Sequence, residues 1–241
     1  MAKNRWLLIE TSGREGLVGL GDGDAMASEV RLDAARSHAR DLVPAVKGLL
    51  DEMGWRSGDL SGIAVSQGPG SYTGLRVGIM AARALTYALG CRLVAVPTFS
   101  VIARQASESA TTLHVIADAL KGKLYVQSFA RADAGAAWSP STELQIVARA
   151  AWLAELRDTI VTGPGVVLIE NQLPSGVAAV PVARRAPGLP ALLQLARSAK
   201  SHSDAMGPLE PLYLRASSGE EQWSGSTSAG LIEPGACTSP S

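Results

Sequence analysis

The stretch SQGPGSYTGLRVG, Ser66–Gly78, decides how the first part of the chain folds. The apolar run GIAV comes directly before it, and the helix-like run VGIMAARALTYALG follows. The stretch itself is rich in glycine and hydroxyl side chains and contains one arginine. This order predicts a sharp connection between a strand and a helix. Such a connection can cradle a phosphate, carry a catalytic group or seat the helix.

The spacing of the residues in this loop does not match three well-known motifs. A Walker A loop needs a lysine after its last glycine, and none follows Gly74. Gly68, Gly70 and Gly74 miss the GxGxxG pattern of dinucleotide sites by one position. Ser71 stands one residue too early for the GxSxG pattern of a nucleophile elbow. The pattern favours a structural or interface turn, and anion binding at the free N–H groups of the helix stays open.

We expect one short segment to form both this loop and the start of the helix. Its residues are Gly68, Gly70, Ser71, Thr73, Gly74 and Arg76.

Composition narrows the classes of partner. The 241 residues are 46% hydrophobic and 18% charged, and the formal net charge is zero. A domain that binds nucleic acid by itself usually has a basic excess, so we expect any nucleic-acid contact to be shared with a partner. Cys91 and Cys237 form no CxxC pair, which fits a reducing compartment. With neither a signal peptide nor a membrane span evident, the sequence predicts a cytoplasmic protein without membrane contact.

The first 108 residues predict the order β-β-β-α-β-α-β-α. Strands are expected at RWLLIE, GLVGLGDGD, AMASEVRL, GIAVS and RLVAVP. The first helix starts either at Asp41 as its cap or nearer Ser37, in which case Pro44 lies inside it. The second helix is expected from about Thr73 to Leu89, and a short third helix is expected to be capped by Thr98.

The second half repeats this order less completely. LHVIADA and KLYVQSFA read as strands joined by a hairpin, STELQIVARAAWLAELR mixes a strand and a helix, TIVTGPG is a strand, PGLPALLQLARSAK is a helix and PLYLR is extended. The repeat predicts a duplicated α/β unit. We expect a first lobe at 1–108, a reduced second lobe at 109–216 and a disordered tail at 217–241.

Small residues recur along the second helix. Gly74, Gly78 and Ala82 follow each other at intervals of four residues and so share one face. That face either packs against the protein's own sheet or receives a helix of a partner. The sequence leaves both interpretations open.

No constellation of catalytic or metal-ligating residues is evident. His38, His114 and His202 are scattered and lie in no HxxxH or HExxH pattern. Asp118 stands at the predicted hairpin, where capping the turn is its ordinary role. We therefore expect no catalytic residue, no metal and no cofactor.

The sequence resembles a known family at several points. GPGSYTGLRVGIMAARAL is similar to the GPGSFTGLRIG signature of the bacterial TsaB (YeaZ) subunits. LLIETS resembles the opening strand LaIDTS of that family, RSHARDLVPAVKGLLDEMG its first helix, and DALKGKLYVQSF its DARrgeVY hairpin. TGPG and EPLYLR resemble its glycine turn and its closing PxYLR. The resemblance spans Leu7 to Arg215.

This resemblance implies both a fold and a role. The fold is that of actin, sugar kinases and heat-shock ATPases, with a reduced second lobe. The role is that of a non-catalytic subunit that pairs with the transferase TsaD and works with the ATPase TsaE. Together they place threonylcarbamoyl on the adenosine beside the anticodon of ANN-reading tRNAs. Contact with tRNA would run through the complex, and a homodimer is a further possibility.

The resemblance also implies that pairing uses the first two helices. The expected interface residues are Val46, Leu49, Leu50, Gly78 and Ala82, and Ala82 is expected to be exposed in the isolated chain.

Four positions depart from the family pattern. Glu10 replaces an aspartate, Tyr72 replaces a phenylalanine, and Lys121 and Lys123 stand in the hairpin. Residual nucleotide contact at Glu10 and Ser12 stays open for this reason. The alternative function is a small-molecule kinase or peptidase on the same fold. The stretch IADALKGK lacks the DxGxxT form that a kinase of this fold needs, and no peptidase constellation is evident.

Overall fold

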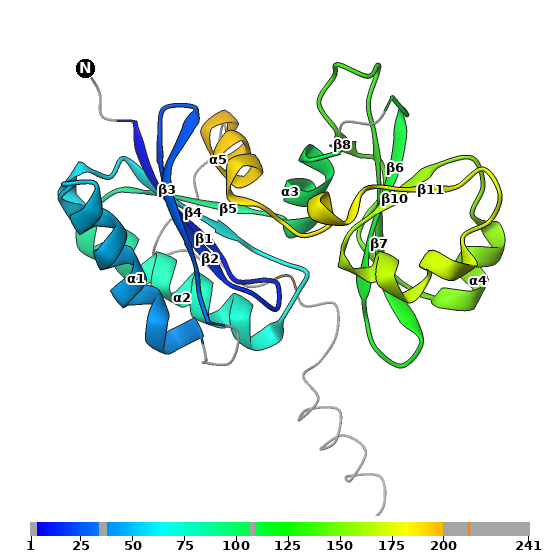
Figure 1. Ribbon diagram of the computed structural model, residues 1–241, viewed down its shortest axis with the longest axis horizontal. Helices are drawn as coiled ribbons and strands as arrows, with labels where there is room; N and C mark the ends of the chain where they lie inside the picture. The colour runs from blue at the N-terminus through cyan, green and yellow to red at the C-terminus, as the bar shows by residue number, and fades with distance from the viewer. Residues whose placement is uncertain (1–3, 34–37, 107–108, 200–211, 213–241) are drawn as a thin grey trace, which may run out of the picture.

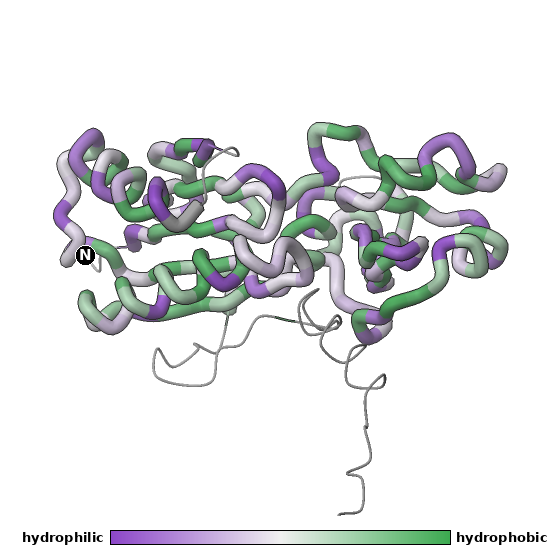
Figure 2. The backbone as a smooth tube through the Cα atoms, turned by 90° about the horizontal axis from the view of Figure 1, so that it is seen from below, coloured by the Kyte–Doolittle hydropathy of each residue, from purple (hydrophilic) through white to green (hydrophobic). Residues whose placement is uncertain are grey.

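Two lobes, each built on one mixed sheet, lie side by side (Figure 1). The computed structural model describes residues 4–33, 38–106, 109–199 and 212. Figure 2 shows the same two lobes from below, with hydrophobic and hydrophilic residues alternating along the helices. No helix within these ranges is long and apolar enough to cross a membrane.

The sheet of the first lobe has five strands in the order β3-β2-β1-β4-β5. β1, β2 and β3 form an antiparallel meander, and β4 and β5 continue the sheet in parallel to β1. The bounds are Arg5–Glu10 for β1, Leu17–Asp22 for β2, Ala25–Arg31 for β3, Gly62–Ser66 for β4 and Arg92–Val96 for β5.

Helices cover both faces of this sheet. α1 (His38–Glu52) and α2 (Tyr72–Leu89) lie below it in Figure 1, and α5 (Leu189–Ser198) lies above it. Side chains alternate along β1, so Leu7 and Ile9 face α1 and α2, whereas Trp6 and Leu8 face α5. Both faces of β1 are therefore buried, which explains its uninterrupted apolar sequence.

The sheet of the second lobe follows the order β11-β10-β6-β7-β8, and β9 also pairs with β7. Antiparallel β6 and β7 form the predicted hairpin, and β10 and β11 are parallel to β6. The bounds are Thr112–Asp118 for β6, Lys123–Ala130 for β7, Ser139–Pro140 for β8, Gln145–Ala148 for β9, Ile160–Thr162 for β10 and Ala178–Ala179 for β11.

The second lobe is a shortened copy of the first. The pairing of β7, β6, β10 and β11 repeats that of β2, β1, β4 and β5. α4 (Arg149–Glu155) occupies the place of α1 in the chain order, and the short turns Pro164–Leu168 and Glu170–Gln172 stand where the first lobe has α2. The predicted duplicated α/β fold of the actin type, with a reduced second lobe, is confirmed.

Two helices cross between the lobes. α3 (Thr98–Arg104) follows β5, yet its Phe99 and Ile102 pack against β6 of the second sheet. α5 follows β11 and the 3-10 turn Val182–Arg184, yet it packs on the first sheet. α3 therefore follows a strand of the first lobe but packs on the second, and α5 follows a strand of the second lobe but packs on the first. The first lobe has one further 3-10 turn, Ser57–Asp59.

The start of α1 agrees with the second predicted alternative, a start near Ser37, whereas the predicted cap of α3 is wrong. α1 begins at His38, so Asp41 lies in its first turn and Pro44 lies inside the helix. Pro44 has no N–H group, and the usual bond to the carbonyl of Arg40 is therefore missing. Pro97 occupies the cap position of α3, and the hydroxyl of Thr98 accepts a hydrogen bond from Gly68 instead. The predicted PLYLR segment and tail lie outside the described residues, apart from Leu212.

Candidate functional site

The motif loop, residues 66–78, is a tightly bonded turn between β4 and α2. The hydroxyl of Ser71 caps α2 by accepting a hydrogen bond of 3.2 Å from the N–H of Gly74. The N–H of Ser71 donates to the carbonyl of Ser12 over 2.7 Å. On the other side, Gly68 and Thr98 exchange two bonds, of 2.8 and 3.0 Å. The loop therefore joins β1, α2 and α3.

The glycines of the loop are required by close approach to the end of β1. A Cβ atom on Gly70 would clash with the carbonyl of Ser12, and one on Gly74 would clash with the carbonyl of Thr11. A Cβ on Gly78 would clash with the hydroxyl of Thr11. Only glycine allows the helix to lie this close to the strand. The small-residue face of α2 thus packs against the protein's own sheet.

The remaining residues of the motif point outward. Thr73 and Arg76 are exposed at the first turn of α2. The guanidinium of Arg76 lies 5.0 Å from the centre of the Tyr72 ring, within the range of a cation–π contact. These side chains are available to a partner at the beginning of the helix.

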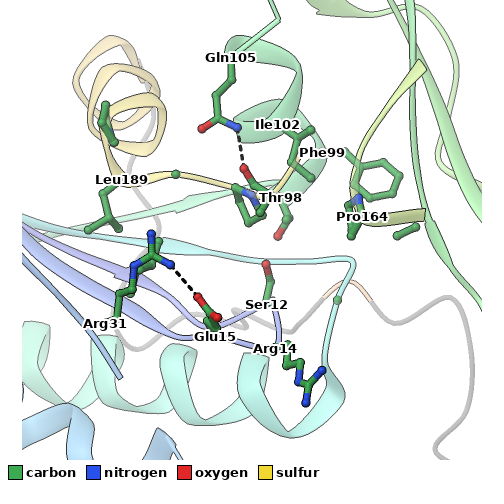
Figure 3. A pocket seen from close by; sticks show the side chains of 18 of the residues that line it. Ser12, Arg14, Glu15, Arg31, Thr98, Phe99, Ile102, Gln105, Pro164 and Leu189 are labelled. Carbon is green, nitrogen blue, oxygen red and sulfur yellow. Dashed lines mark hydrogen bonds and ion pairs between the residues drawn. The ribbon is translucent and has the colours of Figure 1, made fainter. Parts of the chain in front are cut away.

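A cleft of about 570 Å³ opens between the two lobes (Figure 3). Phe99 and Ile102 of α3, Leu189 of α5 and Pro164 form its apolar walls. Polar residues from the turn after β1, from the end of β3 and from α3 and its C-cap also line the cleft, namely Ser12, Arg14, Glu15, Arg31, Thr98 and Gln105. Two of them, Arg31 and Glu15, form an exposed ion pair of 2.8 Å.

Glu10, the acidic residue at the end of β1, is not among the residues that line this cleft. Its carboxylate is 1% exposed and accepts hydrogen bonds from the N–H of Ser12 (2.7 Å), the hydroxyl of Ser12 (2.5 Å) and the hydroxyl of Ser66. Burial raises the pKa of Glu10, and the three hydrogen bonds oppose that rise. Both carboxylate oxygens are committed within the fold.

The residues of the cleft do not fit the magnesium nucleotide that this fold type implies. Both oxygens of Glu10 are used internally, and Asp118 of the second lobe accepts a bond of 2.7 Å from Leu120 in its own exposed turn. Asp118 therefore caps the turn of the hairpin, as predicted. Within the described ranges, no group of three or more His, Cys, Asp or Glu side chains is placed to hold a metal.

Comparisons with known proteins relate this chain to proteins of tRNA threonylcarbamoyladenosine biosynthesis. The family model "TsaD: tRNA N6-adenosine threonylcarbamoyltransferase" matches residues 32–151. The tRNA threonylcarbamoyladenosine biosynthesis protein TsaB of Bacillus subtilis is 32% identical over 119 residues, which cover 49% of this chain and 52% of the relative. The TsaB protein of Escherichia coli is 28% identical over 141 residues, covering 58% and 61%. YeaZ from Pseudomonas aeruginosa has the same fold, with a TM-score of 0.72, 23% identity and coverage of 88% of this chain and 100% of that chain.

The chain is similar to TsaB/YeaZ proteins both in sequence and in fold. The matched stretches span less than two thirds of both curated relatives. The predicted resemblance to TsaB/YeaZ proteins is confirmed.

The predicted interface residues are buried within the single chain. The relative exposures are 5% for Val46, 4% for Leu49, 8% for Leu50 and 0% for Ala82, and Gly78 is buried as well. The expectation that Ala82 is exposed is wrong. These residues pack with β1, β2 and β4 in the core below the first sheet, because that is the nearest apolar surface for both helices.

Other residues of the same two helices face outward. Val43 on α1 is 56% exposed, and Met80 and Tyr87 on α2 are 63% and 70% exposed. These three residues define the outward face of α1 and α2. A surface hollow of about 530 Å³ adjoins it, with Val43, Leu85, Leu89 and Trp55 in its lining. The buried residues Val46 and Leu50 also contribute to the lining of this hollow.

Sequence patterns contained a signal for this face. Met80 and Tyr87 are seven residues apart, almost two turns of helix, and so share one side of α2. That side lies away from Gly78 and Ala82. α2 therefore carries large apolar side chains on the side opposite its small-residue face.

His114 is the one histidine whose side chain the structure describes. Its Nδ1 lies 2.9 Å from the hydroxyl of Ser128, and its ring meets Trp152 edge to face at 5.8 Å between centres. Burial lowers the pKa of His114. This contact lies within the second lobe and outside the cleft lining, so it belongs to the packing of that lobe.

Proposed function

We propose that this chain is a non-catalytic partner subunit that pairs with a TsaD-type transferase. The pair would act in the threonylcarbamoylation of the adenosine beside the anticodon of ANN-reading tRNAs. The observation that carries the proposal is the outward face of α1 and α2, where Val43, Met80 and Tyr87 remain exposed. The similarity to TsaB proteins suggests the reaction, since those relatives are named for threonylcarbamoyladenosine biosynthesis.

The chemistry of this face suits a stable interface. Methionine and aromatic residues are enriched in interfaces, and a few central residues dominate the binding energy. A specific interface buries about 800 Å² on each partner, an area within reach of two exposed helices and an adjoining hollow. The hollow beside Val43 offers a place for an apolar side chain of the partner.

The likeness to the TsaD family model supports the choice of partner. That model covers residues 32–151, which include both α1 and α2. A transferase of that family is therefore expected to present a similar pair of helices, and two such pairs can pack as a four-helix contact. The alternative of a homodimer uses the same face.

The state of Glu10 supports a role without catalysis. Its buried carboxylate is bonded to Ser12 and Ser66, and so the site offers no free acid at the end of β1. A TsaE-type ATPase would supply ATP hydrolysis, and tRNA would bind through the assembled complex, in the cytoplasm. No observation favours the alternative of a small-molecule kinase or peptidase.

Reconstitution tests the proposal. The purified chain is combined with a TsaD-type transferase, a TsaE-type ATPase, threonylcarbamoyl-adenylate and an ANN-reading tRNA, and the modified nucleoside is measured. We expect product only when the chain is present, and no ATP or peptide turnover by the chain alone. Full modification without the chain, or ATP turnover by the chain that Glu10→Gln abolishes, contradicts the proposal.

A further inference from the structure

Within the described part of the chain, two short stretches join the lobes. Residues 97–98 lie between β5 and the helix α3, which packs on the second sheet. Residues 186–188 lie where the chain leaves the second lobe and enters α5, which packs on the first sheet. Rotation of two lobes relative to each other needs φ and ψ changes at a few connecting residues of this kind. We therefore call these stretches the first and the second hinge.

The first hinge is held by the motif loop. The N–H of Thr98 donates a hydrogen bond of 2.8 Å to the carbonyl of Gly68, and the hydroxyl of Thr98 accepts one of 3.0 Å from the N–H of Gly68. The N–H of Gln67 donates a further bond of 2.8 Å to the carbonyl of Val96. The ring of Pro97 fixes the φ angle of that residue. Rotation at the first hinge would therefore disturb all three hydrogen bonds.

The second hinge is held by Gln105, the residue at the C-cap position of α3 (Figure 3). Its Nε2 donates a hydrogen bond of 2.7 Å to the carbonyl of Ala186 and a longer one of 3.4 Å to the carbonyl of Arg184. In return, Nη1 of Arg184 donates a bond of 3.2 Å to the carbonyl of Gln105. A Cβ atom on Gly188 would lie 2.5 Å from the amide oxygen of Gln105. One side-chain amide thus contacts the hinge on both sides of Pro187.

The residues on which Gln105 depends are anchored in the second lobe. Arg185, just before the second hinge, is buried and donates to the carbonyl of Val180 over 2.6 Å and to the carboxylate of Glu170 over 2.8 Å. Gln105 itself ends α3, whose Phe99 packs against the second sheet. The amide of Gln105 is therefore fixed to the second lobe and holds the residues that lead into the first.

We propose that Gln105 locks the two lobes at one relative orientation, by fixing the second hinge through its contacts with Arg184, Ala186 and Gly188. Rotation of the first lobe would turn the carbonyl of Ala186 and move Gly188, so it would break the contacts of this amide. The lock keeps the cleft at one width. It is a property of the single chain and does not depend on the proposed transferase partner.

The lock requires a hydrogen-bond donor at position 105. The carbonyls of Arg184 and Ala186 both face Nε2, and carbonyl oxygens accept but do not donate. A glutamate has nearly the size of glutamine, yet its carboxylate would repel both carbonyls. Gln105→Glu therefore separates the hydrogen bonds of this residue from the space that it fills.

Distances between two spin labels test the lock. p-Acetylphenylalanine replaces two exposed residues, Ser57 in the first lobe and Val167 in the second, and a nitroxide is attached to each ketone. The distance distribution of the full chain is measured by pulsed electron paramagnetic resonance, with excess unlabelled chain so that only distances within one chain contribute. We expect a narrow distribution in the parent and its loss in both Gln105→Ala and Gln105→Glu. A broad distribution in the parent overturns the lock.

Gln127→Glu is the matched control, because Nε2 of Gln127 donates a bond of 3.2 Å to the carbonyl of Thr142 within the second lobe. It should keep the narrow distribution, and broadening equal to that of Gln105→Glu contradicts the proposal. A narrow distribution in Gln105→Glu also overturns it, since the side chain would then only fill space. Circular dichroism verifies folding. If the Gln105 variants do not fold, Arg184→Ala decides, because it removes only the reciprocal bond to Gln105. A broader distribution in that variant supports the lock, and the parental one contradicts it.

Discussion

The N–H of Ser71 donates a hydrogen bond of 2.7 Å to the carbonyl oxygen of Ser12 and thereby fixes the start of α2 against the end of β1. The glycines on either side let the two segments approach, because side chains at Gly70 or Gly74 would meet the backbone of Ser12 or Thr11. The motif loop therefore fixes the position of α2 against the sheet. The direction of its outward face follows from this placement.

Gly74→Val tests the close approach. The added side chain meets the carbonyl of Thr11, and overpacking of this kind costs about 1–3 kcal/mol or more. We expect the melting temperature to fall by several degrees in thermal unfolding. Gly48→Val is the control, because a Cβ atom at Gly48 meets nothing within 4 Å. Equal melting of the two variants contradicts the close approach.

Ser71→Ala tests the cap of α2. The substitution removes the acceptor for the N–H of Gly74, and loss of such a cap costs ~1 kcal/mol. A chain of this size should then melt about 2–4 °C lower. Thr73→Ala, at an exposed position two residues later, should melt like the parent. A parental melting temperature for Ser71→Ala would show that the cap contributes nothing.

Ala82→Glu tests the corrected position of Ala82. The residue is fully buried, so the glutamate places an unpaired charge in the core and destabilises the fold by several kcal/mol. We expect a large loss of folded protein in circular dichroism. Ala84→Glu, an exposed position on the same helix, should remain folded. A stable Ala82→Glu variant contradicts the packing of α2 on the sheet.

Glu10→Gln tests the buried carboxylate through pH. The folded pKa of Glu10 is raised above its ordinary value of 4.5, so the folded state holds the proton more tightly than the unfolded state. Stability from this group is therefore present below pH 4.5 and is lost as the pH rises through the folded pKa. Relative to the parent, Glu10→Gln should gain stability as the pH rises from about 4.5, measured by urea unfolding at several pH values. A difference that does not vary with pH contradicts the raised pKa.

The sequence alone predicts the bounds of a helix or strand correctly where hydrophobic pattern and terminating residues agree. β1 has the predicted bounds Arg5–Glu10, because an apolar run at the centre of a sheet is buried on both faces. Gly90 ends α2 as predicted, with the left-handed φ of 61° that favours glycine. The start of α1 could be narrowed only to two alternatives, because Asp41 is a good cap residue and Pro44 is tolerated in a first turn, and the structure has the earlier one, at His38.

The candidate site was less predictable, for physical reasons. Periodicity identifies the apolar side of a helix and does not say what covers it. Val43, Val46 and Leu50 read alike in the sequence, yet the first is 56% exposed and the others are buried. The cleft has no local signature at all, because Ser12, Phe99, Pro164 and Leu189 meet only after both lobes have formed.

The affinity for a TsaD-type transferase tests the central claim most directly. Met80→Glu and Tyr87→Glu each place a charge on the outward face of α1 and α2, and the control Val167→Glu alters a residue of the second lobe that is 73% exposed. Both positions on α2 are exposed, so folding should be preserved, which circular dichroism verifies. Dissociation constants are then measured by sedimentation. We predict that each α2 variant binds at least ~30-fold more weakly, about the loss of one central interface residue, while Val167→Glu binds like the parent. Parental affinity in both folded α2 variants would contradict the account.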